Sequence, residues 1–142
     1  MSSDLAVTRR LGYLLKHAQL RLAELAEPLY APLGVTGRQL ALLTLFGDGP
    51  ALSQQEGAAR LGNDRTTMVA LVDELEDKDL VRREVAPGDR RKRLVTLTGE
   101  GERVRAAGED ATRQAEARLL EHLGEDDAQQ LRAALHRVVR GE

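Results

Sequence analysis

The segment Asp89-Arg90-Arg91-Lys92-Arg93-Leu94-Val95-Thr96-Leu97-Thr98-Gly99-Glu100-Gly101 decides the fold of this chain. Four consecutive cations follow its first residue, and an alternating run of apolar and polar residues then leads to an expected helix start. A second extended run, Leu80–Val85, lies just before the turn residues Pro87 and Gly88. Two such runs joined by a short loop with proline and glycine predict a β-hairpin.

The predicted hairpin carries an excess of positive charge. Six cations and two anions lie between Leu80 and Val95, a formal charge of +4, whereas the whole chain carries −2 and its remainder therefore −6. This much positive charge on one hairpin of an acidic protein predicts a surface that faces phosphate groups. The alternative is a hairpin whose charges are merely solvated. The cations are Arg82, Arg83, Arg90, Arg91, Lys92 and Arg93.

Composition indicates one globular domain, residues 1–142, with a helical core. Of the 142 residues, 42% are hydrophobic and 31% are charged, which is typical of a folded protein. Aromatic residues make up only 2%, so leucine, valine and alanine must fill the core. The same scarcity excludes the aromatic stacking platforms that bind single-stranded nucleic acid.

The sequence offers no sign of catalysis. There is no cysteine, which excludes disulfides, thiolate metal sites and thiol chemistry. The three histidines, His17, His122 and His136, are scattered, and no phosphate loop or dinucleotide fingerprint is present. We therefore expect no enzyme, no catalytic residue, no cofactor and no metal site. No apolar run is long enough to span a membrane and the N-terminus does not resemble a signal peptide, so we expect a cytoplasmic protein.

Besides an N-terminal helix, three helices are predicted between residue 36 and the hairpin. Thr36 to Gln39 and Ser53 to Glu56 both match the capping-box pattern that starts a helix. Gly62 ends the second, short helix, and Asn63 or Asp64 caps the third. Two helices joined by a tight glycine-containing turn and followed by a basic hairpin predict a winged helix-turn-helix core over residues 36–98. The predicted class is mainly α with a small β-hairpin wing.

The third helix has one apolar face and one face left for a partner. Met68, Leu71, Val72 and Leu75 form an i, i+3, i+4, i+7 stripe that we expect in the core. Residues near the helix N-terminus, Arg65, Thr66 and Thr67, then point outward or sideways, where a recognition helix contacts bases and phosphates. The acidic second half, Asp73 to Asp77, is expected to point away from DNA.

Residues 4–28 and 99–140 are predicted to be dimerisation helices. Each carries an apolar stripe that the small winged core cannot cover fully, and an isologous dimer would bury both stripes. Intramolecular packing is the alternative. Tyr13 and His17 lie four residues apart on one face of the first helix. They could line an effector pocket. The favoured alternative is that two amphipathic side chains simply lie at a helix interface.

The wing and the third helix resemble the MarR (multiple-antibiotic-resistance regulator) family. The family's wing signature is Asp-x-Arg, three residues, Leu or Val, x, Leu-Thr, two residues, Gly. The positions Asp89, Arg91, Val95, Leu97, Thr98 and Gly101 match it. Residues 64–76 also look like the family's recognition helix, and the resemblance covers nearly the whole chain.

The resemblance implies a homodimeric transcriptional repressor of pseudo-palindromic double-stranded DNA, relieved by a small, often aromatic and anionic, ligand. It places Arg65, Thr66 and Thr67 in the major groove and Arg90 and Arg91 on the wing, in the flanking minor groove. It places Ser53, Gln54 and Gln55 at a helix N-terminus that meets phosphate. The alternative function is a winged-helix module that binds an acidic protein partner and not DNA.

The chain departs from the family pattern at a few positions. Val69, Ala70 and Glu74 stand where many members have polar or basic residues, which leaves fewer base contacts and gives more weight to DNA shape. Asp79 stands where a glycine commonly ends the recognition helix, and aspartate tolerates the left-handed conformation needed there. The absence of cysteine excludes the branch that senses peroxide through a thiol.

Overall fold

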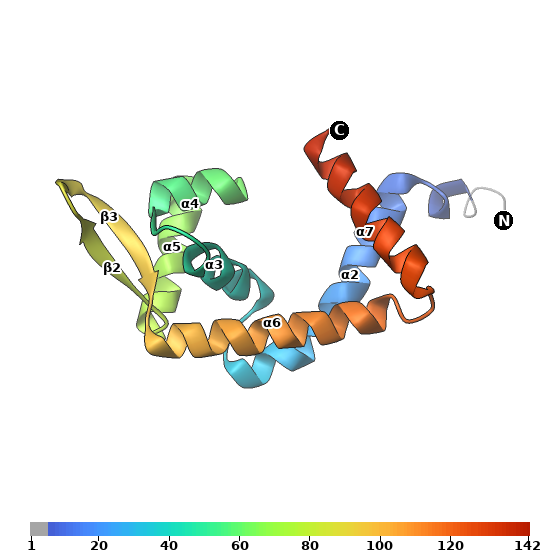
Figure 1. The fold of residues 1–142 in the computed structure, drawn as a ribbon, viewed down its shortest axis with the longest axis horizontal. Coiled ribbons are helices and arrows are strands. Elements are labelled where there is room, and N and C mark those ends of the chain that lie inside the picture. The colour runs from blue at the N-terminus through green and yellow to red at the C-terminus, as the bar shows by residue number, and fades with distance from the viewer. Residues whose placement is uncertain (1–5) are drawn as a thin grey trace. The chain divides into compact units, whose positions relative to one another are not determined.

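The computed structural model describes residues 6–142 and is mainly helical, with one small antiparallel sheet (Figure 1). This confirms the predicted class, and the helix-helix-hairpin order is present. The elements are α2 (Leu11–Tyr30), a 3-10 turn η1 (Ala31–Leu33), α3 (Gly37–Gly47), β1 (Leu52–Ser53), α4 (Gln54–Leu61), α5 (Arg65–Asp77), β2 (Val81–Ala86), β3 (Asp89–Leu97), α6 (Gly99–Leu119) and α7 (Glu125–Arg140).

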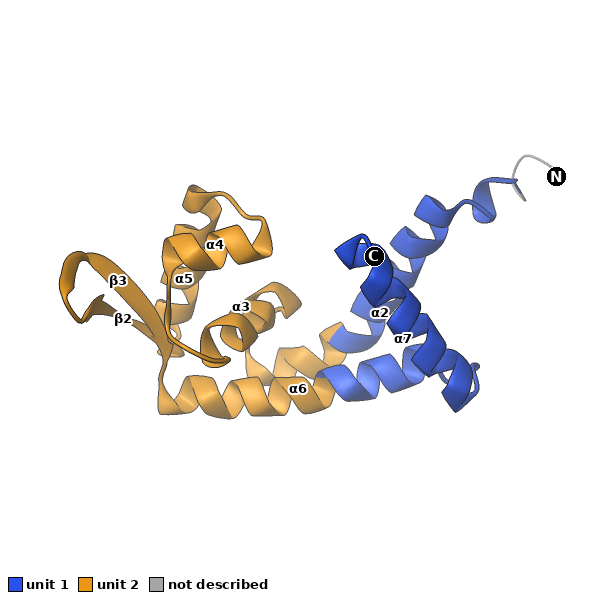
Figure 2. Cartoon of the chain, turned by 45° about the horizontal axis from the view of Figure 1, so that its top comes forward, with its two compact units in different colours: residues 1–26, 112–142 blue, residues 27–111 orange. Residues whose placement is uncertain are grey.

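The chain divides into two compact units, residues 27–111 and residues 1–26 with 112–142 (Figure 2). Helices α2 and α6 each run from one unit into the other. The first unit contains the helices α3, α4 and α5 and the sheet. The second contains most of α2, the end of α6 and all of α7. Residues 4 and 5, at the start of the predicted dimerisation segment, lie outside the described residues.

Local hydrogen bonds start the helices of the 27–111 unit where the sequence predicts. Thr36 Oγ1 accepts from the Gln39 amide while Gln39 Oε1 accepts from the Thr36 amide, both at 3.1 Å. Ser53 and Glu56 make the same reciprocal pair at the start of α4, at 3.1 and 3.0 Å. Asp64, the second of the two predicted caps, starts α5 by accepting from the Thr67 amide. Each cap satisfies backbone donors that the first helical turn leaves without partners.

The sheet has three strands in the order β1-β3-β2, whereas the sequence predicts only two. Strands β2 and β3 form the predicted hairpin, with Val81 opposite Leu97 and a register shift between Val85 and Ala86. The additional strand β1 has only two residues and pairs Leu52 with Val95. Two residues are too few to show the alternation by which a strand is recognised in a sequence.

The core of this unit is aliphatic, as the composition predicts. Met68, Val72 and Leu75 of α5 are fully buried, and Leu71 is nearly so, which confirms the predicted stripe. They pack in one cluster with side chains from α3, the sheet and α6. The main contributors from those elements are Leu40, Leu42, Leu43, Phe46, Leu52, Val81, Val95 and Val104.

A tight corner connects the recognition-helix segment, the hairpin and α6. Asp79 has φ 60°, the left-handed conformation predicted for this position. Thr98 Oγ1 donates to the Asp79 carbonyl at 2.7 Å and accepts from the Gly101 amide at 3.0 Å, so it also caps α6. Gly101 lies so close to Leu80 that an added Cβ would be 2.0 Å from the Leu80 carbonyl oxygen. This contact explains the glycine in the wing signature.

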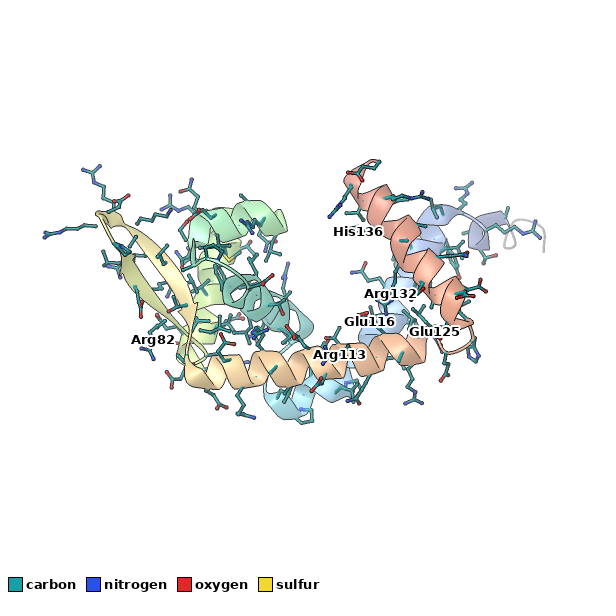
Figure 3. All side chains as sticks on the ribbon, in the orientation of Figure 1. Arg82, Arg113, Glu116, Glu125, Arg132 and His136 are labelled. Carbon is teal, nitrogen blue, oxygen red and sulfur yellow. The ribbon has the colours of Figure 1, made fainter. Side chains whose placement is uncertain are left out.

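Helix α2, which begins in the other unit, continues past Pro28 to Tyr30, two residues beyond the predicted end. Proline lacks only one helical hydrogen bond, and it does so here in the last turn before η1 begins. Helix α7 begins after Gly124, as predicted, with three acidic residues in its first turn and two arginines in its last. Arg132 of α7 donates to Glu116 of α6 at 2.7 Å, and Figure 3 shows the two side chains pointing toward each other.

Much of the apolar surface of the terminal helices is exposed. The exposed side chains are Leu11, Leu14, Leu15 and Leu20 of α2 and Leu131, Leu135, Val138 and Val139 of α7. Isolated exposed apolar residues are common, but eight on two helices form a surface suited to a partner. None of the helices in the described part of the chain is both long enough and apolar enough to cross a membrane.

The close approach at Gly101 predicts a stability difference between two neighbouring glycines. We expect Gly101→Ala to lower the free energy of unfolding by about 1–3 kcal/mol, because the new methyl group must push the start of α6 away from the Leu80 backbone. Gly99→Ala is the matched control, since a Cβ added there would meet nothing within 4 Å. Urea unfolding of both variants measures the difference, and equal stabilities would contradict the packing argument.

Candidate nucleic-acid interface

Three elements of the 27–111 unit enclose one groove of about 740 Å³, named here the basic groove. The N-terminus of α4, the first residue of α5 and the start of β3 provide its walls. Five of the eight residues proposed from the sequence to bind DNA therefore lie around one concave surface. The lining residues are Ser53, Gln54, Gln55, Glu56, Ala59, Arg65, Asp89, Arg91, Lys92 and Arg93.

The α4 side of the basic groove presents a helix N-terminus. Ser53 is buried, and its hydroxyl caps α4 by accepting from the Glu56 amide. Gln54 is half-buried and Gln55 is exposed. The positive end of the α4 dipole lies here, which favours an anionic group such as phosphate.

Glu56 fixes the position of the wing cation Lys92. Its carboxylate accepts from the Ser53 amide and lies 3.0 Å from the Lys92 ammonium. The backbone hydrogen bond from Ser53, followed by the contact with Lys92, lowers the pKa of Glu56 from 4.5 to about 2. The carboxylate is therefore charged at neutral pH, and Lys92 connects β3 to the start of α4.

The α5 side of the groove is formed by its first residue. Arg65 is exposed and lines the groove, while Thr66 is exposed and Thr67 half-buried, and neither threonine is among the lining residues. The Thr67 amide donates to Asp64 Oδ1 at 2.6 Å, which lowers the pKa of that carboxyl and keeps it charged as a cap. The first turn of α5 is thereby held with its outer side chains toward solvent.

The wing side of the groove carries most of its positive charge. Arg91, Lys92 and Arg93 line the groove, whereas Arg90 is exposed but lies outside the lining. Asp89 Oδ1 accepts from the Arg91 amide at 3.0 Å, which stabilises the turn that starts the strand. This contact gives the aspartate of the wing signature a structural role.

Arg83 corrects the sequence-based view of the hairpin charge. It was expected among the cations that face phosphate, but its side chain is only 14% exposed and points into the protein. It pairs with Asp73 at 2.6 Å and with Glu76 at 2.9 Å, both on α5. These two ion pairs partly neutralise the acidic second half of α5.

The structure also adds residues that were not singled out as site residues. Lys92 and Arg93 line the groove, and Glu56 of α4 pairs with Lys92 there. The run of four cations in the sequence pointed to Lys92 and Arg93, but the sequence did not predict that both line the groove. The four cations and two carboxylates of the lining give the groove a formal charge of +2 in a chain of −2.

This arrangement suits a polyanion rather than a reaction. Arginine and lysine side chains, glutamine amides and a helix N-terminus are the donors that proteins use to bind the phosphates of duplex DNA. Within residues 6–142, no three histidine, aspartate or glutamate side chains are grouped so that they could hold a metal ion.

The two residues proposed for an effector pocket are in contact in the other unit. The rings of Tyr13 and His17 are stacked, with centroids 4.0 Å apart and an angle of 29° between their planes. Tyr13 is half-buried and His17 is exposed. Their position on one face of α2 agrees with the helical spacing used to pair them.

Comparisons with known proteins point to one family. A sequence profile described as the MarR family matches residues 33–92. The chain is 28% identical over 146 aligned residues to a putative transcriptional regulatory protein for the hcr operon of Thauera aromatica. That alignment covers 98% of this chain and 88% of the relative.

Solved structures agree over almost the whole chain. The transcriptional repressor CouR, bound to a 23-mer DNA duplex, is 35% identical and has a TM-score of 0.86, over 93% of this chain and 94% of that chain. CouR from Rhodococcus jostii, bound to p-coumaroyl-CoA, is 29% identical and has a TM-score of 0.81, over 93% of both chains. The similarity therefore includes the terminal helices as well as the winged core.

The low pKa of Glu56 predicts a pH-dependent contribution to stability. Because the folded protein holds this pKa at about 2, below 4.5, the charged carboxylate stabilises the fold above pH 4.5, and this contribution is lost as the pH falls toward 2. Glu56→Gln keeps an acceptor for the Ser53 amide but removes the charge. We expect this variant to unfold at a lower temperature than the wild type at pH 7, with the gap closing near pH 2.

Lys92→Gln provides the control for this experiment. It removes the ion pair but leaves the Ser53 hydrogen bond, which is the larger cause of the shift, so the gap should be smaller. Thermal unfolding followed by circular dichroism between pH 2 and 7 measures both variants. A gap for Glu56→Gln that stays constant down to pH 2 would show that its charge does not contribute.

Proposed function

The chain belongs to the MarR family and is a DNA-binding transcriptional regulator rather than an enzyme, and from this premise we propose that it is a homodimeric repressor relieved by a small molecule. Its target is a pseudo-palindromic site in double-stranded DNA. Its proposed compartment is the cytoplasm, where the DNA of its bacterial relatives lies.

The basic groove is the observation that carries this proposal. The α4 N-terminus, the α5 N-terminus and the wing are separated in the sequence, yet their polar side chains line one positively charged surface. The similar repressor CouR was solved on a DNA duplex, and the match covers 93% of this chain. A surface of this charge and size fits a duplex backbone with its adjoining grooves.

Each of the three elements around the basic groove has a distinct role in this proposal. Ser53, Gln54 and Gln55 meet a phosphate at the α4 N-terminus. Arg65, Thr66 and Thr67 enter the major groove, where arginine can contact guanine and threonine a base edge. On the wing, Arg90 and Arg91 reach the flanking minor groove or its phosphates.

The terminal helices complete the protein as a dimer. Eight exposed apolar side chains on α2 and α7 provide the surface that a second copy would cover. A two-fold dimer places two recognition helices about one helical turn of DNA apart, which is why a palindromic site is expected.

The effector proposed here is a small aromatic or anionic compound. CouR from Rhodococcus jostii was solved with p-coumaroyl-CoA, an aromatic acyl thioester. The stacked pair Tyr13 and His17 offers an aromatic surface with polar edges on α2. We propose that this pair contributes to the effector site.

A winged module that binds an acidic protein is the alternative function. It predicts binding to an acidic polypeptide such as polyglutamate and no specific, salt-sensitive binding to duplex DNA. The repressor function predicts a preferred duplex, enriched from a random-sequence library by the wild-type protein, and weak binding to the polypeptide.

The wing role predicts a measurable loss when Arg91 is removed. We expect Arg91→Ala to weaken binding to the selected duplex by about 1–3 kcal/mol and, if it contacts phosphate, to reduce the salt dependence of binding by about one unit of slope. Arg103→Ala, which removes an exposed arginine of α6 paired with Glu100, is the matched control. Unchanged affinity of a folded Arg91→Ala variant would refute the role given to this arginine.

The dimer predicts that one charge on α7 separates the subunits. Leu135 is 38% exposed, so Leu135→Asp should be tolerated within one copy but should bury an uncompensated charge in the interface. We expect sedimentation to show dissociation of the dimer, together with loss of tight binding to a full palindrome. Ala133→Asp, on the opposite face of α7, should remain dimeric. A Leu135→Asp protein that stays dimeric and binds normally would contradict this interface.

A further inference from the structure

Arg83 lies where three elements of the 27–111 unit meet, and the proposed DNA contacts do not use it. Its Nε donates to Gln54 Oε1 of α4 at 2.7 Å. Its Nη1 donates to Glu76 at 2.9 Å, and its Nη2 donates to Asp73 at 2.6 Å and to the Val69 carbonyl at 3.4 Å. One side chain of β2 thus connects the wing with both helices of the helix-turn-helix.

The guanidinium group suits this position because its donors form a rigid planar fork. Arg83 directs donors on three sides and finds an acceptor on each, which allows it to be 14% exposed without an unpaired charge. The partner carboxylates of Asp73 and Glu76 remain 57% and 45% exposed. Water can therefore solvate them if the arginine is removed.

The contact with Gln54 determines which atom of its amide is left to bind a ligand. The Arg83 Nε–H can only donate, so it must meet the amide oxygen of Gln54. The amide nitrogen then remains as the donor, and Gln54 is one of the residues that line the groove. An amide NH2 donates to a phosphate oxygen, whereas an amide oxygen in its place would repel it.

The contacts with α5 also limit how the wing can move. Arg83 binds α5 at three places over two helical turns, from Val69 to Glu76. Arg91 and Lys92 follow on the strand paired with β2. The wing cations and the recognition helix are therefore held in one arrangement before DNA arrives, which reduces the entropy lost on binding.

We propose that Arg83 is a positioning residue for DNA binding, which turns the Gln54 amide donor toward a phosphate and holds the wing against the recognition helix without contacting DNA. The proposal rests on the proposed function, since it assumes that the basic groove binds duplex DNA. It separates the hairpin cations into one that organises the site and others that face the ligand.

The test is a double-mutant cycle with Arg83→Met and Gln54→Met. The probe is the duplex that the wild-type protein enriches from a random-sequence library, and binding is measured at several salt concentrations. We expect Arg83→Met to bind about tenfold more weakly and Gln54→Met about threefold more weakly, in the range set by single hydrogen bonds. The double variant should bind little more weakly than Arg83→Met alone, because Gln54 acts only when Arg83 orients it.

The salt dependence distinguishes positioning from direct contact. Loss of a direct phosphate contact lowers the slope of log K against log salt by about one, so Arg83→Met should leave that slope nearly unchanged. Arg82→Met is the matched control. It removes the same charge one residue earlier on β2, and Arg82 is exposed at the base of the hairpin (Figure 3). We expect a smaller loss of affinity for this control than for Arg83→Met.

Four outcomes would overturn the proposal. These are wild-type affinity of a folded Arg83→Met variant, additive losses in the cycle, a slope reduced by one, or an equal loss for Arg82→Met. If Arg83→Met fails to fold, Gln54→Met decides, because it keeps the Arg83 contacts with α5, and normal binding by that variant would refute the role of the amide. A wild-type protein that enriches no duplex would refute the proposed function itself, before any variant is made.

Discussion

The complete burial of one face of α5 is the constraint on which the rest of this structure depends. Met68, Val72 and Leu75 are fully buried among side chains of α3, the sheet and α6. Because a helix has 3.6 residues per turn, burying that stripe turns Thr66 to the outside, while Arg65 is exposed because it begins the helix, one turn ahead of Met68. The hydrophobic effect that stabilises the domain therefore also decides which residues can meet DNA. Fully burying one such side chain is worth roughly 1.5–3 kcal/mol, and rotating the helix to bury another face would lose this stabilisation for each residue of the stripe.

Charge is arranged around this core in two layers. The inner layer consists of Arg83 with Asp73 and Glu76, and of Lys92 with Glu56, and it joins the wing to the helices. The outer layer consists of arginines that line the groove and do not join the wing to the helices, among them Arg65 and Arg91. Lys92 and Glu56 cancel, and Arg83 with its two carboxylates carries a net charge of −1, so the outer arginines create the positive surface. This is how a chain of formal charge −2 can present a groove of +2.

Much of the fold could be predicted because its signals are local. Thr36 with Gln39 and Ser53 with Glu56 cap helices through partners three residues away, so the capping boxes could be read directly from the sequence. The buried stripe of α5, the left-handed Asp79 and the hairpin were also predicted correctly. For the candidate site, the sequence grouped residues that the fold brings close together: five of the eight proposed residues line one groove, while Thr66, Thr67 and Arg90 lie outside the lining.

The sequence by itself determined the helix starts, the buried face of α5 and the run of cations on the wing, since each depends on residues within about two turns or one strand. Only the tertiary structure decided what those cations do. Arg83 finds Gln54 29 residues earlier in the chain, and Lys92 meets Glu56 across a pairing of strand and helix. The third strand, β1, exists only because β3 is beside it. A charged side chain has no preferred partner until the fold places one within reach, and burial then decides whether it faces the protein or the solvent.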